Sequence, residues 1–158
     1  MIRSGIGYDA HRLAPGRKLI LGGVEIPHER GLEGHSDADV LCHAIADALL
    51  GAVGESDIGH HFPNTDESIR GISSLEILER TNALLGRMQA RAVNVDATLI
   101  AEAPKIAPHI PAMREKIAAA LGLEPSRVSI KATTNEGLGA IGRGEGLAAM
   151  AVATVEME

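Results

Sequence analysis

The 158-residue chain has no tryptophan, one tyrosine and one phenylalanine. Although 45% of its residues are hydrophobic, the core has to be built from small and aliphatic side chains. A chain so short of large aromatic anchors is expected to bury part of its apolar surface between subunits. No apolar run reaches the roughly 18 residues of a membrane-spanning helix, so the sequence predicts a soluble protein with no membrane partner.

Cysteine and positive charge are also scarce. Because Cys42 is the only cysteine, the chain has no internal disulfide, and we expect a reducing, cytoplasmic location. The formal net charge is −6, and like charges do not occur in blocks. A chain of this kind is a poor partner for nucleic acid, which is held mainly through its phosphates. A phosphorylated small molecule would need locally placed cations or metal ions.

Strand and helix patterns alternate along the chain within one expected domain, residues 1–158. We expect an α+β fold in which a mixed β-sheet carries its helices on one face. Gly22-Gly23 predicts a tight hairpin between two of the strands. The expected strands are 2–8, 18–21, 24–26, 90–101, 127–132 and 147–156, and the expected helices are 36–51, 73–85 and a third from Pro108 or Pro111 to Leu121.

The segment from Ser36 to Gly51 predicts a helix that holds a histidine beside the core. Ser36 is a suitable N-cap, and Gly51 is a suitable C-terminal stop. Apolar residues fill one half of the helical wheel, whereas Asp39, His43 and Asp47 form a narrow polar stripe. His43 should therefore lie next to the core without belonging to it, with the two aspartates orienting its ring. A half-buried histidine bonded to an acid is the structural alternative.

Asp9 and His11 follow the first expected strand. If the extended backbone continues through them, both project to the same side, about 7 Å apart at Cα, and both can reach one ion. Together with His43 they would leave one open position on a tetrahedral Zn²⁺. Such an ion acts as a Lewis acid on a phosphoryl or carbonyl oxygen. The same ligand types also suit non-haem Fe(II), and a capping role would explain Asp9 without any metal.

A glycine-rich connection runs from Thr133 to Gly146. Its threonine hydroxyls, glycine N–H groups and Arg143 predict a site for anionic oxygens. Glu136 suits such a loop if it holds Mg²⁺, which bridges phosphate oxygens. The loop matches neither the Walker nor the dinucleotide fingerprint, so an ordinary glycine-rich turn is the alternative.

Several long motifs occur in order along nearly the whole chain: GIGYDAHRL, LGGVEIP, GLEGHSDADVLCHAIADALLGA, SDIGHHFPNTD, AEAPKI and KATTNEGLGAIGRGEG. Together they resemble the 2-C-methyl-D-erythritol 2,4-cyclodiphosphate synthase family of non-mevalonate isoprenoid biosynthesis. The resemblance implies a phosphorus–oxygen lyase that forms 2-C-methyl-D-erythritol 2,4-cyclodiphosphate and CMP from 4-diphosphocytidyl-2-C-methyl-D-erythritol 2-phosphate. It also implies a homotrimer with active sites at the subunit interfaces, and a reaction that needs no protein nucleophile.

The same resemblance implies a role for each matching residue. Zn²⁺ or a similar divalent ion would be bound by Asp9, His11 and His43, and Mg²⁺ or Mn²⁺ on the diphosphate by Glu136. The in-line transfer would be assisted by His35 and Thr134. The methylerythritol phosphate would be bound by Ser36, Asp57, Ile58, Gly59, Phe62, Pro63, Asn64, Thr65, Asp66 and Arg143. The cytidine would be bound by Ala101, Pro104, Lys105, Ile106, Ala107, Ala132 and Thr133.

Three positions depart from the family pattern. Asn64 stands where aspartate is common, Ala140 where phenylalanine is often found, and Met150 where some members carry glutamate. None of these changes removes an expected metal ligand.

Two other functions would use the same three ligands. A Zn²⁺ or Fe(II) hydrolase would need water as its nucleophile, or bound iron and oxygen. A non-catalytic trimeric scaffold would hold a structural metal, so that His43→Ala would dissociate the trimer. The synthase instead predicts that this variant assembles and is inactive.

Overall fold

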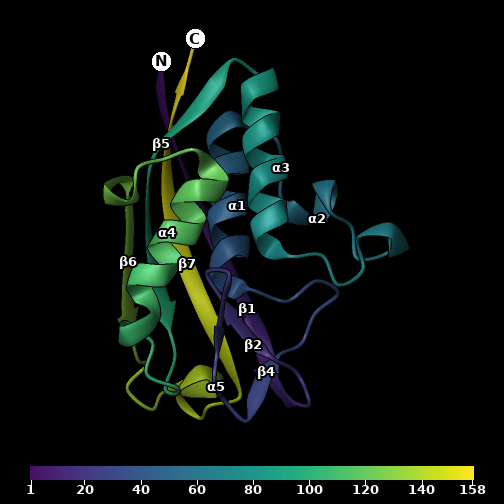
Figure 1. Ribbon diagram of the computed structural model, residues 1–158, viewed down its shortest axis with the longest axis vertical. Helices are drawn as coiled ribbons and strands as arrows, with labels where there is room; N and C mark the ends of the chain where they lie inside the picture. The colour runs from purple at the N-terminus through teal and green to yellow at the C-terminus, as the bar shows by residue number, and fades with distance from the viewer.

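The computed structural model describes residues 1–158 as a five-stranded sheet with a layer of helices on one face (Figure 1). In spatial order the strands are β4 (Arg30–Leu32), β1 (Ile2–Pro15), β7 (Gly146–Met157), β5 (Ala90–Ile100) and β6 (Val128–Thr133). Only β5 and β6 pair in parallel, so the sheet is mixed, as predicted. A separate hairpin of β2 (Leu19–Leu21) and β3 (Val24–Ile26) turns at Gly22-Gly23, also as predicted.

Three long helices form the second layer. They are α1 (Val40–Val53), α3 (Ser74–Arg87) and α4 (Ile110–Leu121). The short elements are α2 (Ile58–His61), α5 (Gly139–Gly142) and the 3₁₀ turns η1 (Glu67–Ile69), η2 (Ala107–His109) and η3 (Pro125–Arg127). None of the helices combines the length and the apolar character that crossing a membrane requires.

Two glycines on β1 let α1 lie directly against the sheet. A Cβ atom on Gly5 would lie 2.0 Å from the carbonyl oxygen of Ala48, and one on Gly7 would lie 1.9 Å from that of Ala44. Both distances are far inside van der Waals contact, so only glycine permits this approach. Asp9 follows on the same face of β1, and the close packing therefore sets where Asp9 meets the helix.

The opposite face of the sheet exposes apolar side chains. Ile6, Tyr8, Met150 and Val152 are 67%, 58%, 44% and 47% exposed. The β1–β7 register places Ile6 beside Val152 and Tyr8 beside Met150, so the four residues form one patch, here called the outer apolar patch. Exposed apolar patches of this kind are common where proteins contact other molecules.

The structure corrects the predicted ends of α1. The N-cap is Asp39 rather than Ser36, because the Asp39 carboxylate accepts the N–H of Cys42. The helix runs through Gly51 and ends at Gly54, whose φ of 79° is the left-handed conformation that glycine adopts at helix ends.

Two further boundaries differ from the prediction. The first strand continues past Tyr8 to Pro15, because it pairs with β7 and then with β4. Residues 30–32, expected to be loop, form β4 against the end of β1. The extension of β1 carries Asp9 and His11 on a regular strand, which fixes their common direction.

Candidate active site

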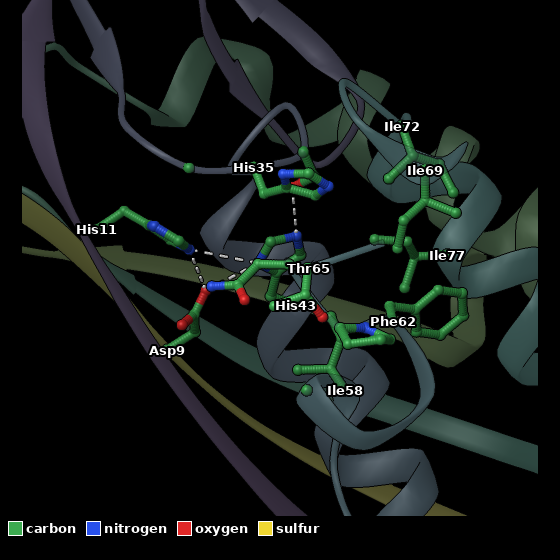
Figure 2. A pocket seen from close by; sticks show the side chains of 15 residues that line it. Asp9, His11, His35, His43, Ile58, Phe62, Thr65, Ile69, Ile72 and Ile77 are labelled. Atoms are coloured by element: carbon green, nitrogen blue, oxygen red, sulfur yellow. Dashed lines mark hydrogen bonds and ion pairs between the residues drawn. The ribbon is translucent and has the colours of Figure 1, made fainter. Parts of the chain in front are cut away.

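Asp9, His11 and His43 converge where β1 passes the start of α1 (Figure 2). Oδ2 of Asp9 lies 2.9 Å from Nε2 of His11 and 3.1 Å from Nδ1 of His43. The two ring nitrogens are 3.4 Å apart, and all three ligand atoms lie within 4.8 Å of one another. The predicted common side of Asp9 and His11 is confirmed. His43 is only 8% exposed, and it lies on the pocket wall beside the apolar cluster rather than within it.

The prediction that Asp39 and Asp47 orient the His43 ring was wrong. Asp39 is fully buried, and its carboxylate accepts backbone N–H groups of the Gly22-Gly23 hairpin at 3.0 and 2.7 Å. Asp47 accepts the N–H of Ile58 at 2.7 Å. Both carboxylates therefore hold backbone segments in place. A backbone N–H group left without its partner in the interior would lower the stability of the fold.

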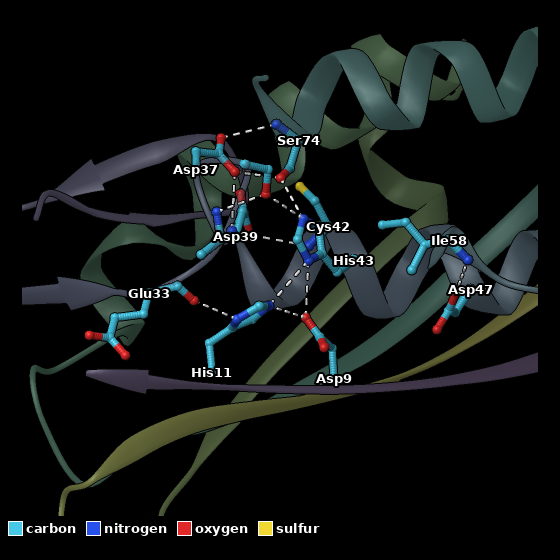
Figure 3. Close-up of polar contacts among 12 residues, drawn as sticks. Asp9, His11, Glu33, Asp37, Asp39, Cys42, His43, Asp47, Ile58 and Ser74 are labelled. Atoms are coloured by element: carbon cyan, nitrogen blue, oxygen red, sulfur yellow. Dashed lines mark hydrogen bonds and ion pairs between the residues drawn. The ribbon is translucent and has the colours of Figure 1, made fainter. Parts of the chain in front are cut away.

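Two serines surround the far side of the His43 ring instead (Figure 3). Nε2 of His43 lies 2.9 Å from Oγ of Ser74 and 3.1 Å from Oγ of Ser36. The Ser74 hydroxyl in turn donates to Asp37. The sequence offered no signal for Ser74 and Asp37 beyond ordinary helix capping, because they meet His43 only through the packing of α3 against α1.

Contacts within the cluster shift the pKa values of Asp9 and His11. Burial alone would raise the pKa of Asp9, but hydrogen bonds and positive charge from the two histidines lower this pKa to about 2. Burial alone would lower the pKa of His11, yet the hydrogen bond and charge of Asp9 raise it above the ordinary 6.5. The carboxylate is therefore ionised at neutral pH, and it attracts either a proton on an imidazole or a cation.

A pocket of 540 Å³ opens beside the cluster. Its polar wall includes Asp9, His11, His35, Ser36 and His43, and its apolar wall is formed by Ile58, Phe62, Ile69, Ile72 and Ile77 (Figure 2). Seven residues expected to bind the methylerythritol phosphate line it, namely Ser36, Ile58, Gly59, Phe62, Pro63, Asn64 and Thr65. The combination suits a small ligand with one polar end and one apolar end.

Asp57 and Asp66, which were expected in the same group, do not line the pocket. Asp57 is the N-cap of α2 and accepts the N–H of His60 at 2.9 Å. Asp66 is the N-cap of η1, and its hydrogen bonds from Ser68 lower its pKa. Its backbone carbonyl accepts a hydrogen bond from Nε2 of His35 at 3.0 Å, which ties the loop to the pocket wall.

The residues expected to bind cytidine and the second metal lie elsewhere, at or just after the C-terminal ends of β5 and β6. They are Ala101, Pro104, Lys105, Ile106, Ala107, Ala132, Thr133, Thr134 and Glu136, and none lines the pocket. Thr133, Thr134 and Glu136 are exposed. Ala101 and Ile106 are 7% and 4% exposed, so a ligand has little access to either residue in a single copy of the chain.

Glu102, which sequence reasoning missed, holds the glycine-rich loop. Its Oε1 accepts the backbone N–H groups on both sides of Glu136, at 2.9 and 3.2 Å. Glu136 itself adopts a φ of 53°, and its carboxylate makes no hydrogen bond or ion pair. Arg143 donates from Nε to the carboxylate of Glu145 at 2.7 Å and stays outside the pocket.

Comparison with known proteins identifies the group to which the sequence belongs. A sequence model described as the YgbB family matches residues 2–156, nearly the whole chain. The chain belongs to the YgbB family. Its relatives include the 2-C-methyl-D-erythritol 2,4-cyclodiphosphate synthase of Symbiobacterium thermophilum. The two are 63% identical over 151 residues, which are 96% of this chain and 96% of that relative. That of Alkaliphilus metalliredigens is 60% identical over 98% of this chain and 97% of its own.

Solved structures of YgbB relatives share the fold. The bifunctional IspDF of Campylobacter jejuni is 38% identical with a TM-score of 0.95; the match covers all of this chain and 43% of that longer protein. The IspF of Plasmodium falciparum, solved as a CDP complex, is 32% identical with a TM-score of 0.86, over 99% of this chain and 97% of its own. The predicted α+β architecture is thus confirmed.

Proposed function

We propose that this protein converts 4-diphosphocytidyl-2-C-methyl-D-erythritol 2-phosphate into 2-C-methyl-D-erythritol 2,4-cyclodiphosphate and CMP, in the synthesis of isoprenoid precursors. One observation carries the proposal: Asp9, His11 and His43 converge on the wall of a pocket, in a chain 63% identical to a synthase of that product. The protein would act as a phosphorus–oxygen lyase by intramolecular phosphoryl transfer.

The histidine–aspartate cluster fits a divalent cation. Nδ1 of His11 lies 2.7 Å from the carbonyl oxygen of Glu33, which only accepts, so in the neutral ring Nε2 carries the free lone pair. Two imidazole nitrogens only 3.4 Å apart need a proton or a cation between them. Asp9, His11 and His43 would hold Zn²⁺ or a similar ion and leave it a position for substrate. Bound there, the ion would supply Lewis-acid stabilisation to phosphate oxygens.

The pocket residues would bind and align the substrate. Ile58 and Phe62 offer the apolar surface that the methyl-bearing carbon skeleton needs. Ser36, on the polar wall, would donate to a phosphate oxygen. His35, anchored by its hydrogen bond to the backbone carbonyl of Asp66, would help to hold the substrate for in-line transfer. The loop residues Pro63, Asn64, Thr65 and Asp66, with Asp57 and Gly59, would hold the methylerythritol phosphate.

The nucleotide half of the site would come from a second copy of the chain. Within one copy, Thr134 and Glu136 lie outside the pocket, although both are expected to act on the diphosphate. Residues 101–107 and 132–133 would hold the cytidine, and Glu136 would hold Mg²⁺ or Mn²⁺. A site divided in this way requires an interface, and a closed ring of copies supplies one for each subunit.

We infer that the assembly is a homotrimer whose contacts cover the outer apolar patch. Four exposed apolar side chains on one sheet face support this assignment, because a monomer would leave them in water. Each subunit would consist of the single domain 1–158, and Arg143 would lie near the three-fold axis. A cytoplasmic location stays a prediction from the single cysteine.

The transfer itself requires alignment more than covalent chemistry. An oxygen of the 2-phosphate attacks the β-phosphorus, a new P–O bond closes the ring, and the bond to the bridging oxygen of the α-phosphate breaks. CMP leaves with that oxygen and its electron pair. The chain has to hold two anionic groups in line against their repulsion, and no protein nucleophile takes part.

Phosphorus NMR tests this proposal. The purified protein is incubated with the diphosphocytidyl substrate, Zn²⁺ and Mg²⁺, with a parallel sample that contains a chelator. We expect signals of CMP and the cyclic diphosphate, lost with the chelator and restored by added metal. Inorganic phosphate released in their place would indicate a hydrolase, and unchanged substrate in an assembled, metal-loaded sample would refute the proposed reaction.

A further inference from the structure

We propose that Ser74 and Asp37 are positioning residues that fix the tautomer of His43, so that its Nδ1 atom presents a lone pair to the metal ion. This inference rests on the metal site proposed above. Neither residue lines the pocket, and both lie behind the His43 ring, on the side away from Asp9 (Figure 3). Ser74 is the first residue of α3, and it reaches His43 across 31 residues of sequence.

Asp37 sets the direction in which the Ser74 hydroxyl hydrogen points. Its carboxylate accepts from the Ser74 hydroxyl, from the Ser74 backbone N–H at 3.0 Å and from the Asp39 N–H at 3.1 Å. An ionised carboxylate has no proton to give. The hydroxyl hydrogen of Ser74 therefore points to Asp37, and the hydroxyl oxygen turns its lone pairs toward His43.

The orientation of Ser74 decides the protonation of the ring. Its Oγ lies 2.9 Å from Nε2 of His43, and the contact is favourable only if Nε2 carries hydrogen. In a neutral imidazole the other nitrogen, Nδ1, then carries no hydrogen and can bind an ion placed between it and Asp9, whose Oδ2 lies 3.1 Å away; without an ion, the Asp9 carboxylate competes for a hydrogen on Nδ1. The opposite tautomer would set two lone pairs against each other at Ser74 and would place a hydrogen where the ion binds.

Ser36 does not fix the tautomer of His43. Its Oγ lies 3.1 Å from Nε2 of His43 and also accepts the N–H of Ala38 at 3.0 Å, but no carboxylate fixes its hydrogen. Once Ser74 sets the tautomer, Ser36 accepts from the ring as well. The Ser36 hydroxyl hydrogen can then be donated to a ligand in the pocket that Ser36 lines.

The contact between Ser74 and His43 is buried on the side of the ring away from the pocket, so water has little access to it. Ser74 is 0% exposed, and His43 is 8% exposed. The backbone N–H of Ser74 bonds to Asp37 independently of the hydroxyl, so the start of α3 stays anchored when the hydroxyl is removed. Ser74→Ala therefore separates the positioning of His43 from the structural anchor of the helix.

The first test measures Zn²⁺ affinity by competition with a chromophoric chelator. We expect Ser74→Ala to bind Zn²⁺ about 10- to 100-fold more weakly, the loss typical when the partner of a ligating histidine is removed. Ser74→Thr, which keeps the hydroxyl, should recover most of the affinity. Ser73→Ala is the matched control, because Ser73 is exposed and its side chain makes no capping hydrogen bond.

The second test observes the tautomer itself, in metal-free protein at about pH 9, where imidazoles are neutral. Nitrogen-15 NMR of the His43 ring should show a larger share of hydrogen on Nε2 in the wild type than in Ser74→Ala, where the Asp9 carboxylate, 3.1 Å from Nδ1, draws the hydrogen to Nδ1. Asp37→Asn removes the carboxylate that fixes the Ser74 hydrogen, so the share of hydrogen on Nε2 of His43 should fall in this variant as well. An unchanged tautomer and unchanged affinity in Ser74→Ala would overturn the inference.

The two proposals fail in different ways. If the wild type binds no Zn²⁺, the proposed metal site is wrong, while the NMR spectrum still decides whether Ser74 orients His43. If the wild type binds Zn²⁺ and Asp9→Asn abolishes binding, but Ser74→Ala matches Ser73→Ala in both measurements, only the positioning role is wrong.

Discussion

Gly7→Ala should damage the metal site without touching any of its ligands. The new Cβ would lie 1.9 Å from the carbonyl oxygen of Ala44 and 2.9 Å from the backbone nitrogen of Ala48. A carbon–oxygen contact needs about 3.3 Å, so α1 and β1 must separate locally by roughly 1.4 Å. Ala44 is the neighbour of His43, and Asp9 follows Gly7 on the strand. The separation therefore acts on the Asp9–His43 distance, now 3.1 Å.

The consequences can be measured on one pair of variants. Metal sites tolerate ligand displacements of only about 0.2 Å, so Zn²⁺ affinity should fall by about tenfold or more. Overpacking against backbone atoms should also lower the free energy of unfolding by about 1–3 kcal/mol, read from thermal or urea unfolding. Gly51→Ala is the control: Gly51 is exposed on the same helix, its Cβ would meet nothing nearer than 3.9 Å, and alanine favours a helix interior. Wild-type affinity and stability in Gly7→Ala would refute the packing argument.

Two further predictions concern ionisation and assembly. Because the folded pKa of His11 is raised, its protonation stabilises metal-free protein below about pH 6.5, and this stability is lost as the pH rises through the raised pKa. Melting temperatures from pH 6 to 9 should show that loss in the wild type but not in Asp9→Asn, and equal profiles would contradict the coupling. Ile6→Asp, in the outer apolar patch, should shift the mass measured by light scattering from that of a trimer to that of a monomer. Lys116→Asp, which changes an exposed residue of α4, should leave the mass unchanged. A trimeric Ile6→Asp would place the interface elsewhere.

Local patterns predicted the parts of the site that lie close together in the sequence. Strand alternation placed Asp9 and His11 on one side, and helical periodicity placed His43 on α1. The fold class followed for the same reason, since each strand and long helix has its own period. The prediction failed at Asp39, because a buried carboxylate can cap its own helix and also hold the distant Gly22-Gly23 turn, which periodicity does not register.

Contacts between distant segments were beyond the sequence. Ser74 looks like an ordinary residue at a helix start, and only the packing of α3 against α1 brings it to His43. Glu102 lies beyond an expected strand, and only the parallel pairing of β5 with β6 brings it to the glycine-rich loop. The resemblance implied active sites at subunit interfaces, and a single copy of the chain holds the expected site residues in two separate groups.

The most direct test of a site shared between copies is complementation between two inactive variants. His43→Ala lacks the pocket ligand, and Glu136→Ala lacks the loop carboxylate on the other half. In trimers assembled at random from equal amounts of both, about one quarter of the interfaces join an intact pocket to an intact loop. Activity of the co-assembled sample, measured as CMP release, should therefore recover to about a quarter of the wild-type value. A mixture that stays inactive, although mixed trimers are shown to form, would mean that pocket and loop do not meet across an interface.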